Sequence, residues 1–151
     1  YRYFIIPSHK ALASQMPYVW DIGQNPDINI LNKMASCLKG EIDCAAFAAS
    51  GDASLSTFRY LEDAHFFYQD IFPQTRSLVF EITANAFLWK MVRSIVGSLI
   101  YFEKSGKDET YFKHVLESRD RSKAGPTAPP QGLFLWNVSF DGIRHDGKSR
   151  S

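Results

Sequence analysis

The chain has 151 residues, of which 45% are hydrophobic and 22% are charged. This length and composition are typical of one soluble globular domain and exclude a wholly disordered chain. The formal net charge is only +1, so overall charge does not indicate a nucleic-acid partner, and any basic surface must be local. No apolar run reaches membrane-spanning length. Two cysteines, Cys37 and Cys44, predict reduced thiols in a cytoplasmic protein rather than a disulfide scaffold.

The first part of the chain predicts a strand followed by a helix. Residues 1–6 (YRYFII) are typical of a strand, and because no lead-in precedes them we expect the chain to be part of a longer protein. After an irregular segment, apolar residues recur at helical spacing. We expect this helix to start at Asp27 or Asn29, either of which can cap it, and to stop at Gly40.

The middle of the chain predicts two strands and then a long helix. One strand is expected at 57–69 and the next at 77–84, where side chains alternate with period two. The two strands are joined through Pro73. Asn85 is a candidate cap for a helix over residues 87–102, where apolar side chains form one stripe.

The last part predicts a helix capped by Asp108, a loop rich in proline and glycine at 123–132, a strand at 133–140 and a flexible tail at 141–151. Neighbouring strands without a crossover helix favour antiparallel pairing. We therefore expect an α+β fold, with helices packed on one face of an antiparallel or mixed sheet.

Arg93 is the first candidate for chemistry, because it lies within the apolar helix. Gly97 is four residues later and so shares its helix face, and a glycine there leaves empty space beside the arginine. Such an arrangement suits a buried guanidinium that reaches a carboxylate or a phosphate. The alternative is an arginine at the edge of the stripe whose long stem covers apolar surface while its charged end stays in water.

Leu133 and Tyr1 are the other candidates. Leu133 follows the stiff loop and lies on the less bulky face of the last strand, at the mouth of the loop. The alternative is that both faces of this strand are buried. Tyr1 shares a strand face with Tyr3, and a phenol there can stack on a base or move a proton. Ordinary strand aromatics explain the same pattern.

Several segments, in order, resemble the signatures of one family. The longest is ANAFLWKMVRSIVG at residues 84–97. The others are YRY at 1–3, GEIDCAAF at 40–47, RYL at 59–61, RDR at 119–121, AGPTAPP at 124–130 and GLFL at 132–135. Together they cover nearly the whole chain, which is thereby identified as similar to the tRNA pseudouridine synthase A family.

The resemblance implies an isomerase that converts uridine to pseudouridine in the anticodon stem-loop of tRNA, without a cofactor or a metal. Its members are homodimers built from two similar α+β halves whose sheets join, and residues 1–151 would be the C-terminal half. The resemblance also implies site roles. Tyr1 would stack on the target base and remove its C5 proton, Arg93 would pair with a nucleophilic aspartate, and Leu133 would form a wall of the uracil pocket.

The family's nucleophilic aspartate lies in an R-T-D-A-G-V-H motif, and no such motif occurs among these 151 residues. We therefore expect the chain alone to be inactive, with the aspartate supplied by an N-terminal half. Two other readings remain open at this point. One is an RNA-binding module that uses the same cleft without turnover, and the other is a domain kept for dimerisation.

Overall fold

A computed structural model describes most of the chain: residues 1–7, 11–12, 14–72, 75–138, 143–144 and 148–149. The strands are β1 (Arg2–Ile6), β2 (Trp20–Asp21), β3 (Gly40–Asp43), β4 (Phe58–Phe72), β5 (Thr75–Ala84), β6 (Leu133–Phe134), β7 (Ile143–Arg144) and β8 (Lys148–Ser149). The α-helices are α1 (Ile28–Ala35), α2 (Met91–Lys104) and α3 (Glu109–Ser118). Short 3-10 turns are η1 (Met16–Tyr18), η2 (Ser36–Leu38), η3 (Ala45–Phe47), η4 (Arg121–Lys123) and η5 (Pro130–Gly132).

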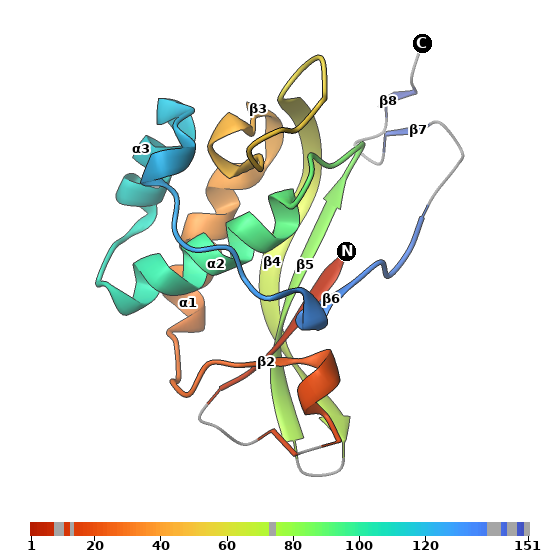
Figure 1. Ribbon diagram of the computed structural model, residues 1–151, viewed down its shortest axis with the longest axis vertical. Coiled ribbons are helices and arrows are strands. Elements are labelled where there is room, and N and C mark those ends of the chain that lie inside the picture. The colour runs from red at the N-terminus through yellow and green to blue at the C-terminus, as the bar shows by residue number, and fades with distance from the viewer. Residues whose placement is uncertain (8–10, 13, 73–74, 139–142, 145–147, 150–151) are drawn as a thin grey trace.

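Six strands form one mixed sheet, in the order β2-β1-β5-β4-β3, with β6 also paired to β1 (Figure 1). The pairing of β1 with β2 is parallel, and the other pairings in this sheet are antiparallel. The long β4–β5 hairpin forms the middle of the sheet. The α+β prediction with an antiparallel or mixed sheet is confirmed.

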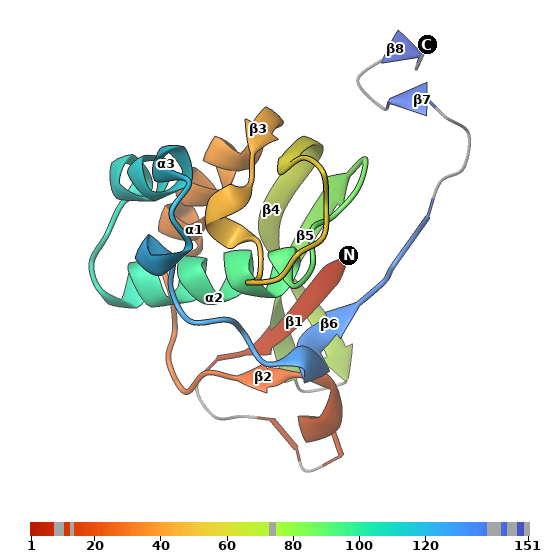
Figure 2. The ribbon, with the colours of Figure 1, turned by 45° about the horizontal axis from the view of Figure 1, so that its top comes forward.

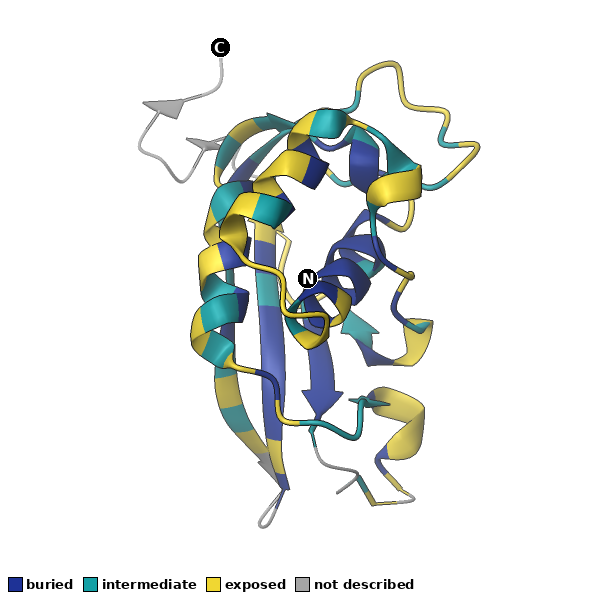
Figure 3. Ribbon diagram, turned by 90° about the vertical axis from the view of Figure 1, so that its left-hand side faces the viewer, coloured by how far each residue is buried: buried dark blue, intermediate teal, exposed yellow. Residues whose placement is uncertain are grey.

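The three α-helices lie together on one face of the sheet (Figure 2). Alternation along β1 directs Tyr3 and Ile5 into the core beneath the helices, where they pack with residues such as Phe80 of β5 and Ile95 of α2. Most of α2 is buried, whereas α1 and α3 each expose one side (Figure 3). The helix α2 therefore lies in the middle of the molecule, between the sheet and the loop that follows η4.

The opposite face of the sheet includes a smaller apolar cluster and the ion pair between Arg2 and Glu81. Phe4 packs there with Val79 and Phe134. Arg2 donates from Nε to Glu81, and its guanidinium lies over the ring of Trp136, 4.4 Å from the ring centroid. Since Phe134 packs on this face while Leu133 packs against the main core, both sides of β6 are partly buried.

Two of the predicted helix caps are confirmed. The Asp27 carboxylate accepts hydrogen bonds from the main-chain N–H groups of Asn29 and Ile30, 2.9 and 3.4 Å away, at the start of α1. Asp108 accepts from Tyr111 at the start of α3, with a donor–acceptor distance of 3.0 Å. The first helix ends earlier than expected as an α-helix and continues as η2, so Gly40 begins β3 instead of stopping the helix directly.

The prediction that Asn85 caps the second helix is wrong. Its side-chain oxygen accepts from the main-chain N–H of Tyr60 at 3.0 Å, so Asn85 extends the β4–β5 pairing. The chain then forms a turn, and α2 begins only at Met91, four residues after the expected start at 87. The residue before α2 is Lys90, whose φ of 57° is in the left-handed region.

The last predicted strand is shorter than expected. Only Leu133 and Phe134 belong to β6, and residues 135–138 are not in a strand. The physical reason is that Phe134 already pairs with Arg2 at the start of β1, so the residues after it lie beyond the paired part of that strand. Residues 139–140 of the predicted strand, and Pro73 of the predicted hairpin connection, lie outside the described residues.

Two further predictions concern the tail and the cysteines. The predicted tail at 141–151 falls mostly outside the described residues, apart from the short β7–β8 pair. Cys37 and Cys44 both carry free thiols, as expected. Among the residues that the structure describes, no helix is both long and apolar enough to cross a membrane.

Candidate active site

The centre of the site is the close contact between α2 and the extended loop at residues 124–129. A Cβ atom built on Gly97 would lie 1.8 Å from the carbonyl oxygen of Pro126 and 2.7 Å from the main-chain nitrogen of Ala128. The sequence-based expectation of empty space beside Arg93 is therefore wrong. The backbone of the loop fills that space. Gly97 is required for this close approach of two backbones.

Hydrogen bonds from α2 and from η4 hold the first part of this loop. The Ser98 hydroxyl accepts from the main-chain N–H of Gly125 at 2.9 Å and donates to the carbonyl of Ser94 at 2.7 Å, so a buried polar pair anchors the loop to α2. Arg121 donates to the carbonyl of Gly125 at 3.3 Å and to the hydroxyl of Thr127 at 2.9 Å. The loop is thus fixed by polar contacts as well as by its prolines.

Arg93 contacts this loop in two ways through a single residue. Its main-chain carbonyl accepts from the N–H of Ala128 at 3.0 Å, and its side-chain Nε donates to the carbonyl of Ala128 at 2.9 Å. Arg93 is partly buried. Because this bond uses Nε, the loop fixes the guanidinium plane, and among the residues that the structure describes the two terminal amino groups remain able to bind a planar anion.

Tyr3 holds the next carbonyl along the loop and was missed as a site residue at the sequence level. It is fully buried, and its hydroxyl donates to the carbonyl of Pro129 at 2.5 Å. Its ring lies against Gly132, where an added Cβ would come within 2.9 Å of two ring carbons. Burial raises the pKa of Tyr3 far above its usual value of 10.0, and the nearby Arg93 guanidinium opposes part of that rise.

Tyr1 lies on the same face of the first strand as Tyr3 but is only partly buried. Its ring meets that of Phe87 edge to face, with the ring centroids 4.9 Å apart. Phe87 belongs to the turn that leads into α2. The phenol of Tyr1 therefore lies beside the segment from which Arg93 emerges, and Phe87 fixes the orientation of its ring.

Leu133 pairs directly with Tyr3 in the β1–β6 ladder and is partly buried against the main core. It follows η5, the turn whose first residue, Pro130, comes directly after the carbonyl that Tyr3 holds. Arg93 binds the carbonyl of Ala128 and Tyr3 binds that of Pro129, the next residue along the chain. The structure thus links the three predicted site residues through Phe87, Tyr3 and the loop.

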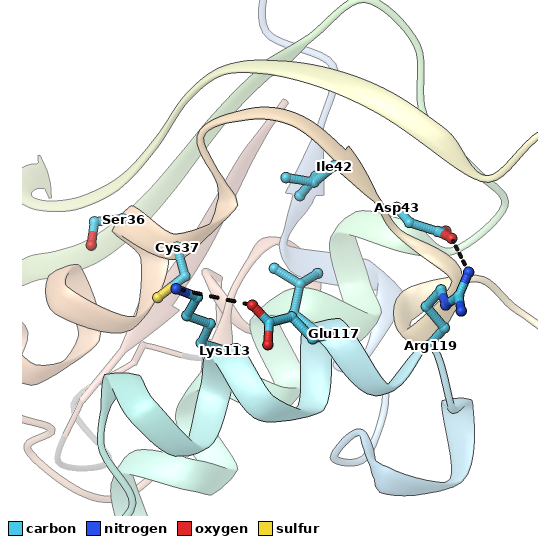
Figure 4. A pocket seen from close by; sticks show the side chains of 8 residues that line it. Ser36, Cys37, Ile42, Asp43, Lys113, Glu117 and Arg119 are labelled. Carbon is cyan, nitrogen blue, oxygen red and sulfur yellow. Dashed lines mark ion pairs between the residues drawn. The ribbon is translucent and has the colours of Figure 1, made fainter.

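A separate hollow of about 530 Å³ lies between α3, η2 and β3 (Figure 4). Its charged lining residues pair with each other, since Arg119 lies 3.8 Å from Asp43 and Lys113 lies 4.0 Å from Glu117. Within this lining every charged side chain therefore has an opposite partner. This hollow is built from other elements than the Arg93 site.

Comparison with known proteins gives consistent matches. A family model described as tRNA pseudouridine synthase matches residues 34–141. A protein named tRNA pseudouridine synthase A from Treponema denticola is 54% identical over 140 residues, which are 93% of this chain and 50% of that protein. Proteins of the same name from Treponema pallidum and from Thermoanaerobacter sp. are 47% and 39% identical over 126 and 142 residues. Those alignments cover 83% and 93% of this chain, and 43% and 55% of the relatives.

The chain thus spans about half the length of the curated relatives that it matches. The matched family segment includes α2 with Arg93, the loop that Arg93 holds, and Leu133. On the extent of the family match and the identity to these relatives, the chain belongs to the tRNA pseudouridine synthase family.

Proposed function

We propose that the full-length protein isomerises uridine to pseudouridine in the anticodon stem-loop of tRNA, and that residues 1–151 are its C-terminal domain. The protein acts in the cytoplasm as a homodimer, without a metal or a cofactor. The observation that carries the proposal is the guanidinium of Arg93, fixed by the Ala128 carbonyl beside Tyr3 and Leu133 in a chain of this family.

The reaction breaks the bond between N1 of the uracil and C1′ of the ribose, rotates the uracil and joins its C5 to C1′. C5 then loses its proton and N1 gains one, so the product is an isomer of uridine. The target uridine must leave its stack for this, and a carboxylate acts as the nucleophile. In our proposal an aspartate from outside these 151 residues supplies the carboxylate. The terminal amino groups of Arg93 bind it, and the adjacent positive charge keeps it ionised by lowering its pKa.

The other residues act on the base. Tyr1 stacks on the uracil and accepts the C5 proton, and its edge contact with Phe87 holds the ring in place. Leu133 forms an apolar wall of the pocket. Tyr3 touches no substrate in this proposal, because its hydroxyl is buried and bonded to Pro129, so it acts only by holding the loop.

The test compares the full-length protein with the 151-residue chain on unmodified tRNA transcripts. Pseudouridine is detected by carbodiimide labelling and primer extension, with and without a chelator. We expect the full-length protein to convert uridines in the anticodon stem-loop in both conditions, and the 151-residue chain to convert none. Conversion by the short chain would disprove the external nucleophile, and no conversion by the full-length protein would disprove the enzymatic function.

A further inference from the structure

The turn between β5 and α2 presents an aromatic side chain to solvent. Trp89 is 57% exposed, and the neighbouring Lys90 is exposed as well. The Lys90 ammonium lies over the indole, 4.8 Å from the centroid of the ring. An exposed tryptophan with a lysine on its face combines a stacking surface with a mobile positive charge.

The main chain holds this turn, and the indole itself is left outside. The N–H of Trp89 donates to the Asp52 carboxylate at 2.6 Å, and its carbonyl accepts from the N–H of Ala49 at 3.1 Å. The preceding Leu88 is buried in the core. The backbone of the turn is therefore tied to residues of another loop, and the indole can be removed without breaking any of these bonds.

The turn is next to the proposed active site along the chain and in space. Phe87, two residues before Trp89, meets the ring of Tyr1 at a centroid distance of 4.9 Å. Arg93, four residues after Trp89, lies in the first turn of α2. An RNA strand that delivered a uridine to Tyr1 and Arg93 would pass close to Trp89.

Cationic side chains occur near the turn, although the whole chain has a net charge of only +1. Lys90 belongs to the turn, Arg93 lies in the first turn of α2, and Arg59 interacts electrostatically with Asp52. Hydrogen bonds from Ser54 and then from the main chain of Trp89 lower the pKa of Asp52, and Arg59 lowers it further. The Asp52 carboxylate, which belongs to the neighbouring loop, is therefore engaged by these donors.

We propose that Trp89 and Lys90 form an RNA-contact site, in which the indole stacks on an unpaired base of the tRNA and the ammonium binds an adjacent phosphate. The flexible lysine stem lets the ammonium move from the ring to the phosphate and uncover the indole. A polyanionic partner is favoured over a protein because lysine is depleted in protein interfaces, whereas phosphates recruit it. The inference rests on the proposed function for the identity of the RNA.

The test measures the affinity of the full-length protein for a fluorescein-labelled anticodon stem-loop by anisotropy. We expect Trp89→Ala to weaken binding about tenfold, since a stacked base loses its aromatic partner. Trp89→Phe retains a ring and should restore most of the affinity. Lys90→Gln should reduce the slope of log affinity against log salt concentration by about one.

Tyr101→Ala is the matched control, because Tyr101 is 51% exposed and lies in the far half of α2, the helix that follows the turn. It should bind like the wild type. Wild-type affinity of Trp89→Ala for the RNA would overturn the inference. If that variant also changed oligomeric state in sedimentation, Trp89 would instead belong to a protein interface. Uridine conversion by the wild-type enzyme is measured separately. RNA binding that depends on Trp89 but is not followed by conversion would disprove the proposed function and leave the RNA-contact site standing.

Discussion

At the scale of single residues, Arg93 and Ala128 form a reciprocal contact. Each donates one hydrogen bond to the main-chain carbonyl of the other, with distances of 2.9 and 3.0 Å. The side chain thereby loses rotational freedom before any ligand arrives. Lysine cannot reproduce this arrangement, because a single ammonium replaces three nitrogens in a fixed plane.

We therefore predict that Arg93→Ala in the full-length protein lowers the rate of pseudouridine formation about 100-fold or more, the cost typical of losing one fixed electrostatic contact to a reacting group. Arg93→Lys should recover little of that loss. Single-turnover conversion of tRNA measures both variants, and thermal unfolding shows that they are folded. Wild-type turnover in Arg93→Ala would remove this residue from the site.

Gly97 gives a second prediction, in which two effects of one methyl group oppose each other. Helix propensity alone would stabilise Gly97→Ala by about 1 kcal/mol. The added Cβ would lie 1.8 Å from the Pro126 carbonyl oxygen, so backbone must move, and overpacking of this kind costs about 1–3 kcal/mol. We expect a net loss in the free energy of unfolding, measured with urea. Lys104→Ala, an exposed position of α2, is the control, and a stabilised Gly97→Ala would contradict the close packing.

Helical spacing correctly placed Arg93 and Gly97 on one helix face. The expected role of the glycine, to leave empty space beside the arginine, was wrong, because the loop backbone packs there. Helical spacing is local information, whereas the contact of Gly97 involves a loop almost thirty residues later in the chain. Tyr3 was passed over for a related reason. The partner of its hydroxyl is 126 residues away, and no spacing rule reaches that far.

At the scale of elements, α1 is joined to the sheet by the side chain of Asn32. Its amide accepts from the main-chain N–H of Phe66 at 2.7 Å and donates to the carbonyl of Phe66 at 3.1 Å. β3 pairs with β4 only as far as Leu61, so Phe66 lies on a part of β4 that β3 does not cover. The amide thus satisfies a strand edge in the way that a neighbouring strand would.

We predict that Asn32→Ala destabilises the protein by about 1–3 kcal/mol, because two main-chain groups of Phe66 lose their partner. Asn29→Ala, an exposed position on the same helix, should change stability by less than about 0.5 kcal/mol. Urea unfolding of both variants tests the difference. Equal stabilities would show that water replaces the amide at no cost.

Element types were predictable because they follow from local periodicity, and the errors lie where tertiary contacts override it. Asn85 has the right chemistry for a helix cap, but Tyr60 on the neighbouring strand takes its side chain. The strand expected at 133–140 has suitable residues throughout. It forms only where β1 offers unpaired backbone groups, and a sequence pattern does not record that limit.

At the scale of the whole molecule, burial sets how stability depends on alkaline pH. Burial raises the pKa of the Cys44 thiol from 9.0 to about 12, with Asp43 adding to the shift, and it raises that of Tyr3 above 10.0. Both groups are neutral when protonated. Their stabilising contribution is fully present below the unfolded values of 9.0 and 10.0, and it is lost as the pH rises past them toward the higher folded values.

We predict that the free energy of unfolding falls more steeply above pH 9 in the wild type than in a Cys44→Ala, Tyr3→Phe double variant. Urea titrations between pH 8 and pH 11 measure how the free energy of unfolding of each protein changes with pH. In the difference between the two slopes, the contributions of groups that titrate in both proteins cancel. A thiol reagent at pH 8 should also leave Cys44 unmodified until the protein unfolds. Parallel slopes, together with rapid modification of Cys44, would refute this account.

The pairing of β1 with β6 has a consequence for the order of events during synthesis. The hydroxyl of Tyr3 and the carbonyl of Pro129 come from nearly opposite ends of the chain. While a ribosome is still translating α3, Ala128, which holds Arg93, has not been synthesised. The strand β1 also lacks its later partner β6 at that stage. The nascent polypeptide can therefore complete the proposed site only after translation has passed Leu133.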